Sequence, residues 1–180
     1  GVNGVRAVLP ELGVIDFAIV GEPTGLEMAI AEKGLMVVDC VAHGKAGHAA
    51  RNEGENALYK ALDDIDWCRN YEFEKKSPTL GEVKLTVTMI EAGSQHNVIP
   101  DTCKFTADIR LTECYSHQEV LEIMQANMQA EVIPRSMRLR ASGIDSNHPI
   151  VGKHLSMKRE VFGSSTMSDQ ALMSFSSVKV

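Results

Sequence analysis

The chain has 180 residues, of which 44% are hydrophobic, and its 18 basic and 24 acidic side chains give a net charge of −6. This size suits one compact core, or one domain with pieces of another. No block of like charge indicates a nucleic-acid or anionic-membrane surface, and no apolar run approaches the roughly 20 residues of a membrane span. Four scattered cysteines without CxxC spacing predict free thiols in a reducing compartment, and we expect a cytoplasmic protein.

Both ends of the chain have the character of parts of a larger unit. Residues 4–11 predict a short helix ended by Pro10. "IDFAIVGEP" (15–23) predicts a buried, central parallel strand that carries Glu22 to the carboxyl edge of a sheet. The final "SFSSVKV" has the pattern of a strand. We therefore expect this chain to be a segment of a larger protein.

Between these ends, the hydrophobic pattern predicts a complete small domain. Strands are expected at 28–41, 83–90, 103–110 and 135–142, and helices at 56–69 and about 117–130. A capping box from Ser116 to Glu119 opens the second helix. Alternation on the second strand places four apolar side chains on one face: Val83, Leu85, Val87 and Met89. On the fourth strand it places Met137, Leu139 and Ala141 inward.

The resulting order, β-α-β-β-α-β, is that of a ferredoxin-like α+β domain. We predict that residues 27–143 form this domain and that it is inserted into a larger α/β domain. Residues 1–26 and 144–180 are then partial segments of that α/β domain.

The stretch "HGKAGHAARNEG" (43–54) mixes glycine with titratable side chains, and we expect neither a helix nor a strand there. Spacing of five residues and the glycines argue against His43 and His48 as a helical metal pair. A loop histidine that donates a hydrogen bond to an oxyanion is the functional interpretation of His48. An ordinary surface histidine is the alternative.

Three further positions suggest a site. Glu22 fits a metal ligand or a turn residue equally well, since no second ligand lies nearby in the sequence. Asn97 lies in the polar connection "EAGSQHNVIPD" (91–101), and Arg110 ends a strand, where it is suited to carboxylate recognition. Both also fit ordinary turn and surface roles. Asp169, with Ser168 beside it and the helical pattern "DQALM" after it, suggests a helix N-cap.

In this order, the motifs resemble those of the dinuclear metal amidohydrolases. They are "VGEPT", "AEKGLMVVDCVAHGKAGHAARNEGENAL", "AGSQHNVIPD", "ADIR" and "STMSDQAL". This family contains acetylornithine deacetylase, succinyl-diaminopimelate desuccinylase, carboxypeptidase G and aminoacylase. The resemblance covers the chain from end to end and is strongest toward the acetylornithine deacetylase branch.

The resemblance implies a catalytic α/β domain with two zinc ions, or cobalt or manganese, and a lid domain that forms a homodimer. Glu22 matches a carboxylate that ligates one zinc. His48 matches a lid histidine that reaches the partner subunit's active site and polarises the scissile carbonyl. Asn97 and Arg110 match positions that hold the substrate, and the region of Ser168 matches a loop that lines the active site.

The family's HxD motif, Glu-Glu pair and final histidine ligand have no counterpart in this chain. We therefore expect the chain alone to bind no zinc tightly and to be inactive. The implied function is removal of an acyl group from an N-acyl amino acid such as acetylornithine by metal-activated water. Two alternatives stay open: a succinyl substrate, as in succinyl-diaminopimelate or succinylornithine, and a dimerisation or small-ligand-binding module without catalysis.

Overall fold

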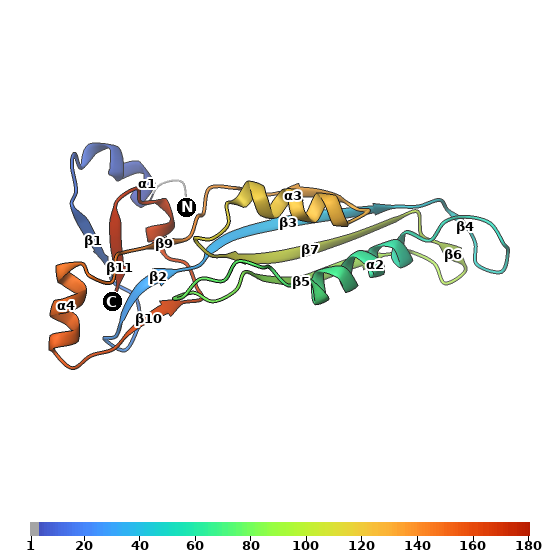
Figure 1. Ribbon diagram of the computed structural model, residues 1–180. Helices are drawn as coiled ribbons and strands as arrows, with labels where there is room; N and C mark the ends of the chain where they lie inside the picture. Colours follow the sequence, from blue (N-terminus) through green and yellow to red (C-terminus); the bar gives the residue numbers. More distant parts are fainter. Residues whose placement is uncertain (1–3) are drawn as a thin grey trace.

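The computed structural model describes residues 4–180, and residues 1–3 lie outside the description. The molecule is elongated, and its two main sheets lie end to end (Figure 1). The chain starts in a five-stranded sheet, crosses into a four-stranded sheet, reaches a two-stranded tip and finally returns. The first described residues and the C-terminus therefore lie in the same half of the molecule.

The two ends of the chain build the five-stranded sheet. It has the order β1-β11-β2-β10, with β9 paired to β2, and contains both parallel and antiparallel pairs. Its strands are β1 (Phe17–Val20), β2 (Met28–Glu32), β9 (Ser142–Gly143), β10 (Val161–Ser164) and β11 (Ser176–Lys179). The prediction of a buried, central strand at the start of the chain is wrong for this structure. β1 is an edge strand, and its side chains alternate between exposed and half-buried.

Short helices accompany this sheet. They are α1 (Val5–Val8), the 3-10 helix η1 (Leu9–Glu11), α4 (Pro149–Ser156) and the 3-10 helix η2 (Asp169–Leu172). The helix predicted at 4–11 is thus divided, because Pro10 lies in the 3-10 turn that ends it. The apolar core of this region is small and consists of Met28, Ile30, Val151 and Val178.

One continuous stretch builds the four-stranded unit (residues 34–134). Its antiparallel strands have the order β5-β7-β3-β8, and two helices cover one face (Figure 1). The elements are β3 (Gly34–His43), α2 (Ala57–Asn70), β5 (Lys84–Ala92), β7 (Thr102–Leu111), α3 (His117–Asn127) and β8 (Glu131–Pro134). Their chain order is β-α-β-β-α-β. The far end is the tip, in which β4 (Gly47–His48) pairs with β6 (Val98–Ile99).

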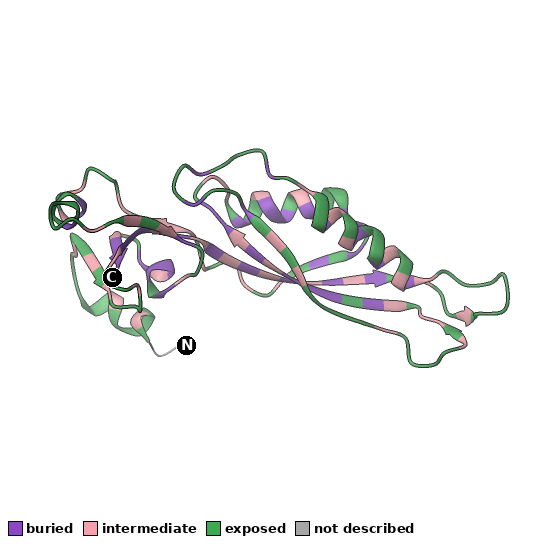
Figure 2. Ribbon diagram, turned by 90° about the horizontal axis from the view of Figure 1, so that it is seen from below, coloured by how far each residue is buried: buried purple, intermediate pink, exposed green. Residues whose placement is uncertain are grey.

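Alternation along the two central strands produces the core of this unit. Every second side chain is buried: Met36, Val38, Cys40 and Ala42 on β3, and Cys103, Phe105, Ala107 and Ile109 on β7. The helices supply the opposite wall, with Ala57, Ala61, Cys68, Val120 and Met124. Figure 2 shows the inner helix faces as buried and the outer faces as exposed.

Both helices of the unit begin at side-chain caps. The Asn56 side chain accepts the backbone N–H of Leu58 at 3.0 Å. The predicted capping box is confirmed, because Ser116 accepts the N–H of Glu119 and Glu119 accepts the N–H of Ser116. The predicted free thiols are also confirmed, and burial raises the pKa of Cys40 and of Cys68 to about 12.

Two strand predictions are wrong in their sheet membership. The single strand predicted at 28–41 is divided at Lys33: β2 belongs to the five-stranded sheet and β3 to the four-stranded one. By sheet membership, the border of the four-stranded unit is therefore near Lys33, not at residue 27. The fourth strand is β8 (Glu131–Pro134) instead of 135–142. Of that later segment, Leu139 forms only an isolated bridge to Leu35, and Ser142 begins β9 in the other sheet.

Two further predictions fail locally. Alternation predicts that Met89 shares a face with Leu85 and Val87, but a register shift between Val87 and Met89 interrupts the alternation. Met89 is 63% exposed, whereas Leu85 and Val87 are half-buried. The prediction that 43–54 forms neither a helix nor a strand is wrong, and the polar connection predicted at 91–101 is partly regular. Each contains a two-residue strand, because the tip pairs Gly47 with Ile99 and His48 with Val98.

Candidate functional site

The crowded glycine-rich stretch forms the tip of the four-stranded unit, where two runs of backbone lie very close together. A Cβ on Gly44 would lie 2.2 Å from the carbonyl oxygen of Glu55, and one on Gly47 would lie 2.7 Å from that of Glu53. Any side chain there would force the backbone to shift. The glycines thus let the tip fold back on itself, and Lys45 and Glu55 exchange two backbone hydrogen bonds of 2.9 Å.

His48 is held by its backbone and by its ring. Its backbone N–H donates to Oε1 of Glu53 at 3.1 Å, and its Nδ1 accepts the backbone N–H of Ala50 at 3.1 Å. Its carbonyl accepts the N–H of Arg51 at 2.9 Å, which closes a turn. The side chain is exposed, and its Nε2 has no hydrogen-bond partner among residues 4–180. The tip therefore leaves one imidazole nitrogen of His48 exposed and without a partner among the described residues.

The structure brings Asn97 next to His48. The pairing of β4 with β6 sets His48 opposite Val98, and the backbone N–H of Ala49 donates to the Asn97 carbonyl at 2.9 Å. The amide of Asn97 makes no hydrogen bond within the described part of the chain. A free imidazole nitrogen and a free carboxamide thus lie together at the tip, and both can bind a polar ligand atom.

Arg110 lies at the opposite end of the unit. On β7 it pairs with Leu35, which is near the crossing between the two sheets. About 26 Å of strand, at about 3.3 Å per residue, separates it from Thr102, and His48 lies beyond that residue in the tip (Figure 1). Its guanidinium donates to both carboxylate oxygens of Asp108, at 2.7 and 2.9 Å. One protomer therefore does not bring Arg110 and His48 to a common site.

Glu22 follows β1 in the five-stranded sheet, as the sequence indicated. Its backbone N–H donates to the carbonyl of Val180 at 2.8 Å, and its side chain is exposed. Within residues 4–180, no group of three or more His, Cys, Asp or Glu side chains is placed to hold a metal ion. The described residues therefore do not form a metal centre by themselves.

The region of Ser168 contains a buried polar network that the sequence did not reveal. The N-cap of η2 is Ser168 and not the predicted Asp169, which is the first residue of η2. The backbone N–H and hydroxyl of Ser168 both donate to the Glu32 carboxylate. Lys179 Nζ lies 3.4 Å from the same carboxylate and donates to the Ser164 hydroxyl at 2.7 Å. The side chain of Glu32 is fully buried, and that of Lys179 nearly so. The network ties the end of β2 to the loop before η2.

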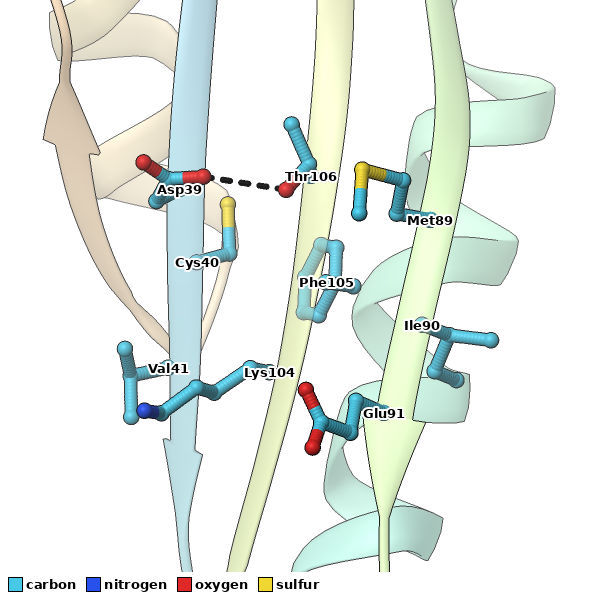
Figure 3. A pocket seen from close by; sticks show the side chains of 9 residues that line it. All are labelled: Asp39, Cys40, Val41, Met89, Ile90, Glu91, Lys104, Phe105 and Thr106. Carbon is cyan, nitrogen blue, oxygen red and sulfur yellow. Dashed lines mark hydrogen bonds between the residues drawn. The ribbon is translucent and has the colours of Figure 1, made fainter.

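A groove of about 540 Å³ lies on the sheet face that the helices leave uncovered (Figure 3). Asp39 in this groove accepts hydrogen bonds from Thr106 at 2.9 Å and from the Arg135 guanidinium at 2.7 Å. The Arg135 hydrogen bonds lower the pKa of the Asp39 carboxyl. None of the four predicted site residues lines the groove, so it is separate from the candidate site.

The four-stranded unit thus has candidate site residues at both of its ends, His48 and Asn97 at the tip and Arg110 near the crossing between the sheets. Residues 30–135 match the family model of the peptidase dimerisation domain of the M20 peptidases. This match covers more than half of the chain, and the chain therefore belongs to the M20 family. The resemblance to acetylornithine deacetylase, succinyl-diaminopimelate desuccinylase and carboxypeptidase is confirmed at the level of the family.

Curated relatives carry more than one name. The chain is 30% identical over 126 residues to a succinyl-diaminopimelate desuccinylase of Corynebacterium glutamicum, with 68% of this chain and 34% of that protein covered. It is 27% identical over 137 residues to an acetylornithine deacetylase of Myxococcus xanthus, with 72% and 36% covered. A succinyl-diaminopimelate desuccinylase of Wolbachia pipientis wMel is 30% identical over 103 residues, with 53% and 26% covered. The chain spans about a quarter to a third of the length of these relatives.

Solved structures confirm a mixed α+β fold of the M20 type. The M20 metallo-carboxypeptidase Sso-CP2 of Sulfolobus solfataricus superposes with a TM-score of 0.70 at 13% identity, with 98% of this chain and 65% of that chain covered. YXEP of Bacillus subtilis, a dinuclear metal binding M20 peptidase, gives a TM-score of 0.64 at 16% identity, with 97% and 51% covered. No helix among residues 4–180 is long and apolar enough to cross a bilayer.

Proposed function

We propose that this chain is the dimerising lid, with flanking strands, of a metal-dependent hydrolase that removes the acyl group from an N-acyl amino acid. The observation that carries the proposal is the tip, where His48 and Asn97 present free polar groups at the far end of a domain of the M20 family. We assign His48 the role of hydrogen-bond donor to the carbonyl oxygen as it becomes an oxyanion. We also take the four-stranded unit to be ferredoxin-like and the protein to be cytoplasmic, in accord with its element order and free thiols.

The separation between the two ends of the unit supports a shared active site in a dimer. His48 and Asn97 lie at the tip, whereas Arg110 lies more than about 26 Å away at the crossing between the sheets. We propose that Arg110 serves the site of its own protomer and that the tip serves the site of its partner. In that site, the Arg110 guanidinium would bind the substrate carboxylate. It would either release Asp108 or bind both carboxylates at once.

Strand β5 is the edge we propose for the homodimer. It is the long outer strand of the four-stranded sheet, and it exposes Met89 and Ile90. Helix α2 packs beside it and exposes Tyr59 and Leu62. A long edge strand with exposed apolar side chains is a ready pairing surface. The other edge, β8, has only four residues and ends in proline, which lacks an N–H for pairing.

The dimer surface can be tested on the 180-residue chain by sedimentation equilibrium. Ile90→Lys should raise the dimer Kd by about tenfold or more, because it replaces an exposed apolar side chain of the proposed edge with a charge that the interface would bury. Ile133→Lys, on the exposed opposite edge at β8, is the matched control and should leave the Kd unchanged. A monomeric wild-type chain, or equal effects of both substitutions, would rule out this surface.

Glu22 is the only metal ligand that we propose in this chain. Its position after β1 suits a carboxylate ligand of zinc, cobalt or manganese, but the described residues include no further ligands around it. We therefore derive no catalytic step through the metal from this chain. Glu22→Gln in an active enzyme that carries this segment should lower the bound metal, whereas His48→Ala should not.

The proposed substrate carries either an acetyl or a succinyl group. The motifs favour acetylornithine, while the relatives include both an acetylornithine deacetylase and succinyl-diaminopimelate desuccinylases. Turnover of acetylornithine, succinylornithine and succinyl-diaminopimelate, each with added zinc or cobalt, decides between them. His48→Ala should abolish most turnover at unchanged metal content. Unaltered turnover in His48→Ala would show that the four-stranded unit is a dimerisation module and not a catalytic lid.

A further inference from the structure

We infer that the tip fixes His48 in the tautomer that carries its proton on Nε2, and that Glu53 is the positioning residue that maintains this state. Only one part of the inference rests on the proposed function, namely that the Nε2 proton is donated to the oxyanion of the substrate. The geometry itself lies entirely within this chain, so it can be tested without any turnover.

The first step concerns the ring. A neutral imidazole has one nitrogen with a proton and one without. Nδ1 of His48 accepts the backbone N–H of Ala50 at 3.1 Å, and a nitrogen that accepts an N–H carries no proton. The proton of the neutral ring is therefore on Nε2, which is the nitrogen that has no partner within residues 4–180. The tip thus presents a hydrogen-bond donor, as stabilisation of an oxyanion requires.

The second step concerns what holds the ring over the N–H of Ala50. The carboxylate of Glu53 accepts the backbone N–H of His48 at 3.1 Å, and the Arg51 guanidinium lies 3.8 Å from the same oxygen. The carboxylate therefore joins both ends of the turn that includes Ala50. Gly47 allows the backbone of Glu53 to lie against this turn, which brings the Glu53 carboxylate within hydrogen-bond distance of the His48 N–H. Without the carboxylate, the backbone N–H of His48 loses its partner and the turn loses its anchor.

The charged groups around His48 also argue for Glu53 in particular. Glu55, two residues further along, directs its carboxylate to Lys60 at 2.8 Å and not to the histidine. The two glutamates thus have the same charge and lie in the same loop, but only Glu53 contacts His48. This difference provides a matched control.

The test is nitrogen NMR of the 15N-labelled 180-residue chain at about pH 8.5, two units above the usual histidine pKa of about 6.5. We expect His48 to show Nε2 as fully protonated and Nδ1 as fully unprotonated, whereas the exposed His96 should show averaged tautomers. Glu53→Ala should reduce the separation of the two His48 nitrogen shifts toward that of His96. Glu53→Gln, which keeps an accepting oxygen, and Glu55→Ala should both preserve it.

Three NMR results would overturn the inference: averaged or Nδ1-protonated His48 in the wild-type chain, an unchanged Glu53→Ala spectrum, or an equal loss in Glu55→Ala. In an active enzyme that carries this segment, Glu53→Ala should lower kcat about ten- to a hundredfold with little change in KM, as misplacement of a reacting group does, and Glu53→Gln should restore it. If His48→Ala collapses turnover and Glu53→Ala does not, this inference fails and the proposed function stands. If His48→Ala has no effect on turnover, the proposed function fails while the tautomer remains as NMR finds it.

Discussion

The two sheets of this molecule are stabilised in different ways. The four-stranded unit comes from one continuous stretch of chain and buries a large apolar core between its sheet and two helices. The five-stranded sheet is assembled from distant segments, and its apolar cluster is small, with Met28, Ile30, Val151 and Val178 buried. In place of a larger core it contains the buried network of Glu32, Lys179 and Ser168.

This difference indicates how the two regions respond to perturbation. Burial of apolar side chains is non-directional, so the four-stranded unit tolerates small shifts in packing. A buried ion pair requires its geometry, and the loss of one partner leaves a charge without compensation. We expect the two regions to unfold as separate cooperative units. The free energy of local unfolding should be lower for the five-stranded sheet than for the four-stranded unit.

The largest effect is expected from Glu32. Glu32→Gln leaves the Lys179 ammonium buried without its carboxylate and should lower the free energy of unfolding by about 3–5 kcal/mol. Urea unfolding of the 180-residue chain measures it. The double variant Glu32→Met with Lys179→Met should recover most of the loss, because no charge remains buried. A loss in the double variant as large as in Glu32→Gln would show that packing, not charge, dominates.

The corresponding change in the apolar core is Met124→Ala. Met124 is fully buried between α3 and the sheet, and its truncation should cost about 2–5 kcal/mol. Met157→Ala is the control, since that side chain is 55% exposed, and it should leave stability nearly unchanged. Hydrogen exchange should show the Met124→Ala effect in β3 and β7. Equal loss of protection in β2 and β11 would show that the two sheets unfold as one unit.

How far the sequence predicts this structure also differs between the regions. The alternation of β3 and β7 and the capping box at Ser116 identified the four-stranded unit because its contacts repeat with the period of each element. The division of the strand at Lys33 was missed because an apolar run has the same pattern whichever sheet it enters. Strand β8 was placed too late, since the Asp64 carboxylate, which accepts the N–H groups of Gln129 and Ala130, orients the chain there. That contact spans more than 60 residues.

The candidate site shows the same limit. Motifs identified His48 and Asn97, and the structure places them together at the tip. The distance of Arg110 from them follows from strand register, which the motif order does not contain. Glu53 and Glu32 carried no sequence signal, because each acts through one hydrogen-bonded contact that only the folded chain creates.

A smaller effect is expected at the start of α3, and it depends on pH. Ser116→Ala removes the cap and should cost about 1 kcal/mol. The backbone N–H of Ser116, followed by Lys75, lowers the pKa of Glu119 from 4.5 to about 2. A lowered pKa stabilises the fold above the unfolded-state value, and this stabilisation disappears as pH falls from 4.5 through about 2. Carbon NMR should show Glu119 titrating near pH 2 in the wild type and at higher pH in Ser116→Ala.

The smallest expected effect is a gain in stability, and it concerns the region of the five-stranded sheet. Gly152 is in the middle of α4 with open space where a Cβ would lie, so Gly152→Ala should stabilise the chain by about 0.5–1 kcal/mol through helix propensity. Gly81 also has open space, but its φ is +71°, and Gly81→Ala should destabilise the chain because alanine disfavours that backbone. If the five-stranded sheet opens first, Gly152→Ala should raise the free energy of exchange in β2 and leave β7 unchanged. A gain shared equally by both strands would mean that α4 stabilises the molecule as a single unit, and the contrast between the two sheets would then concern composition and not cooperativity.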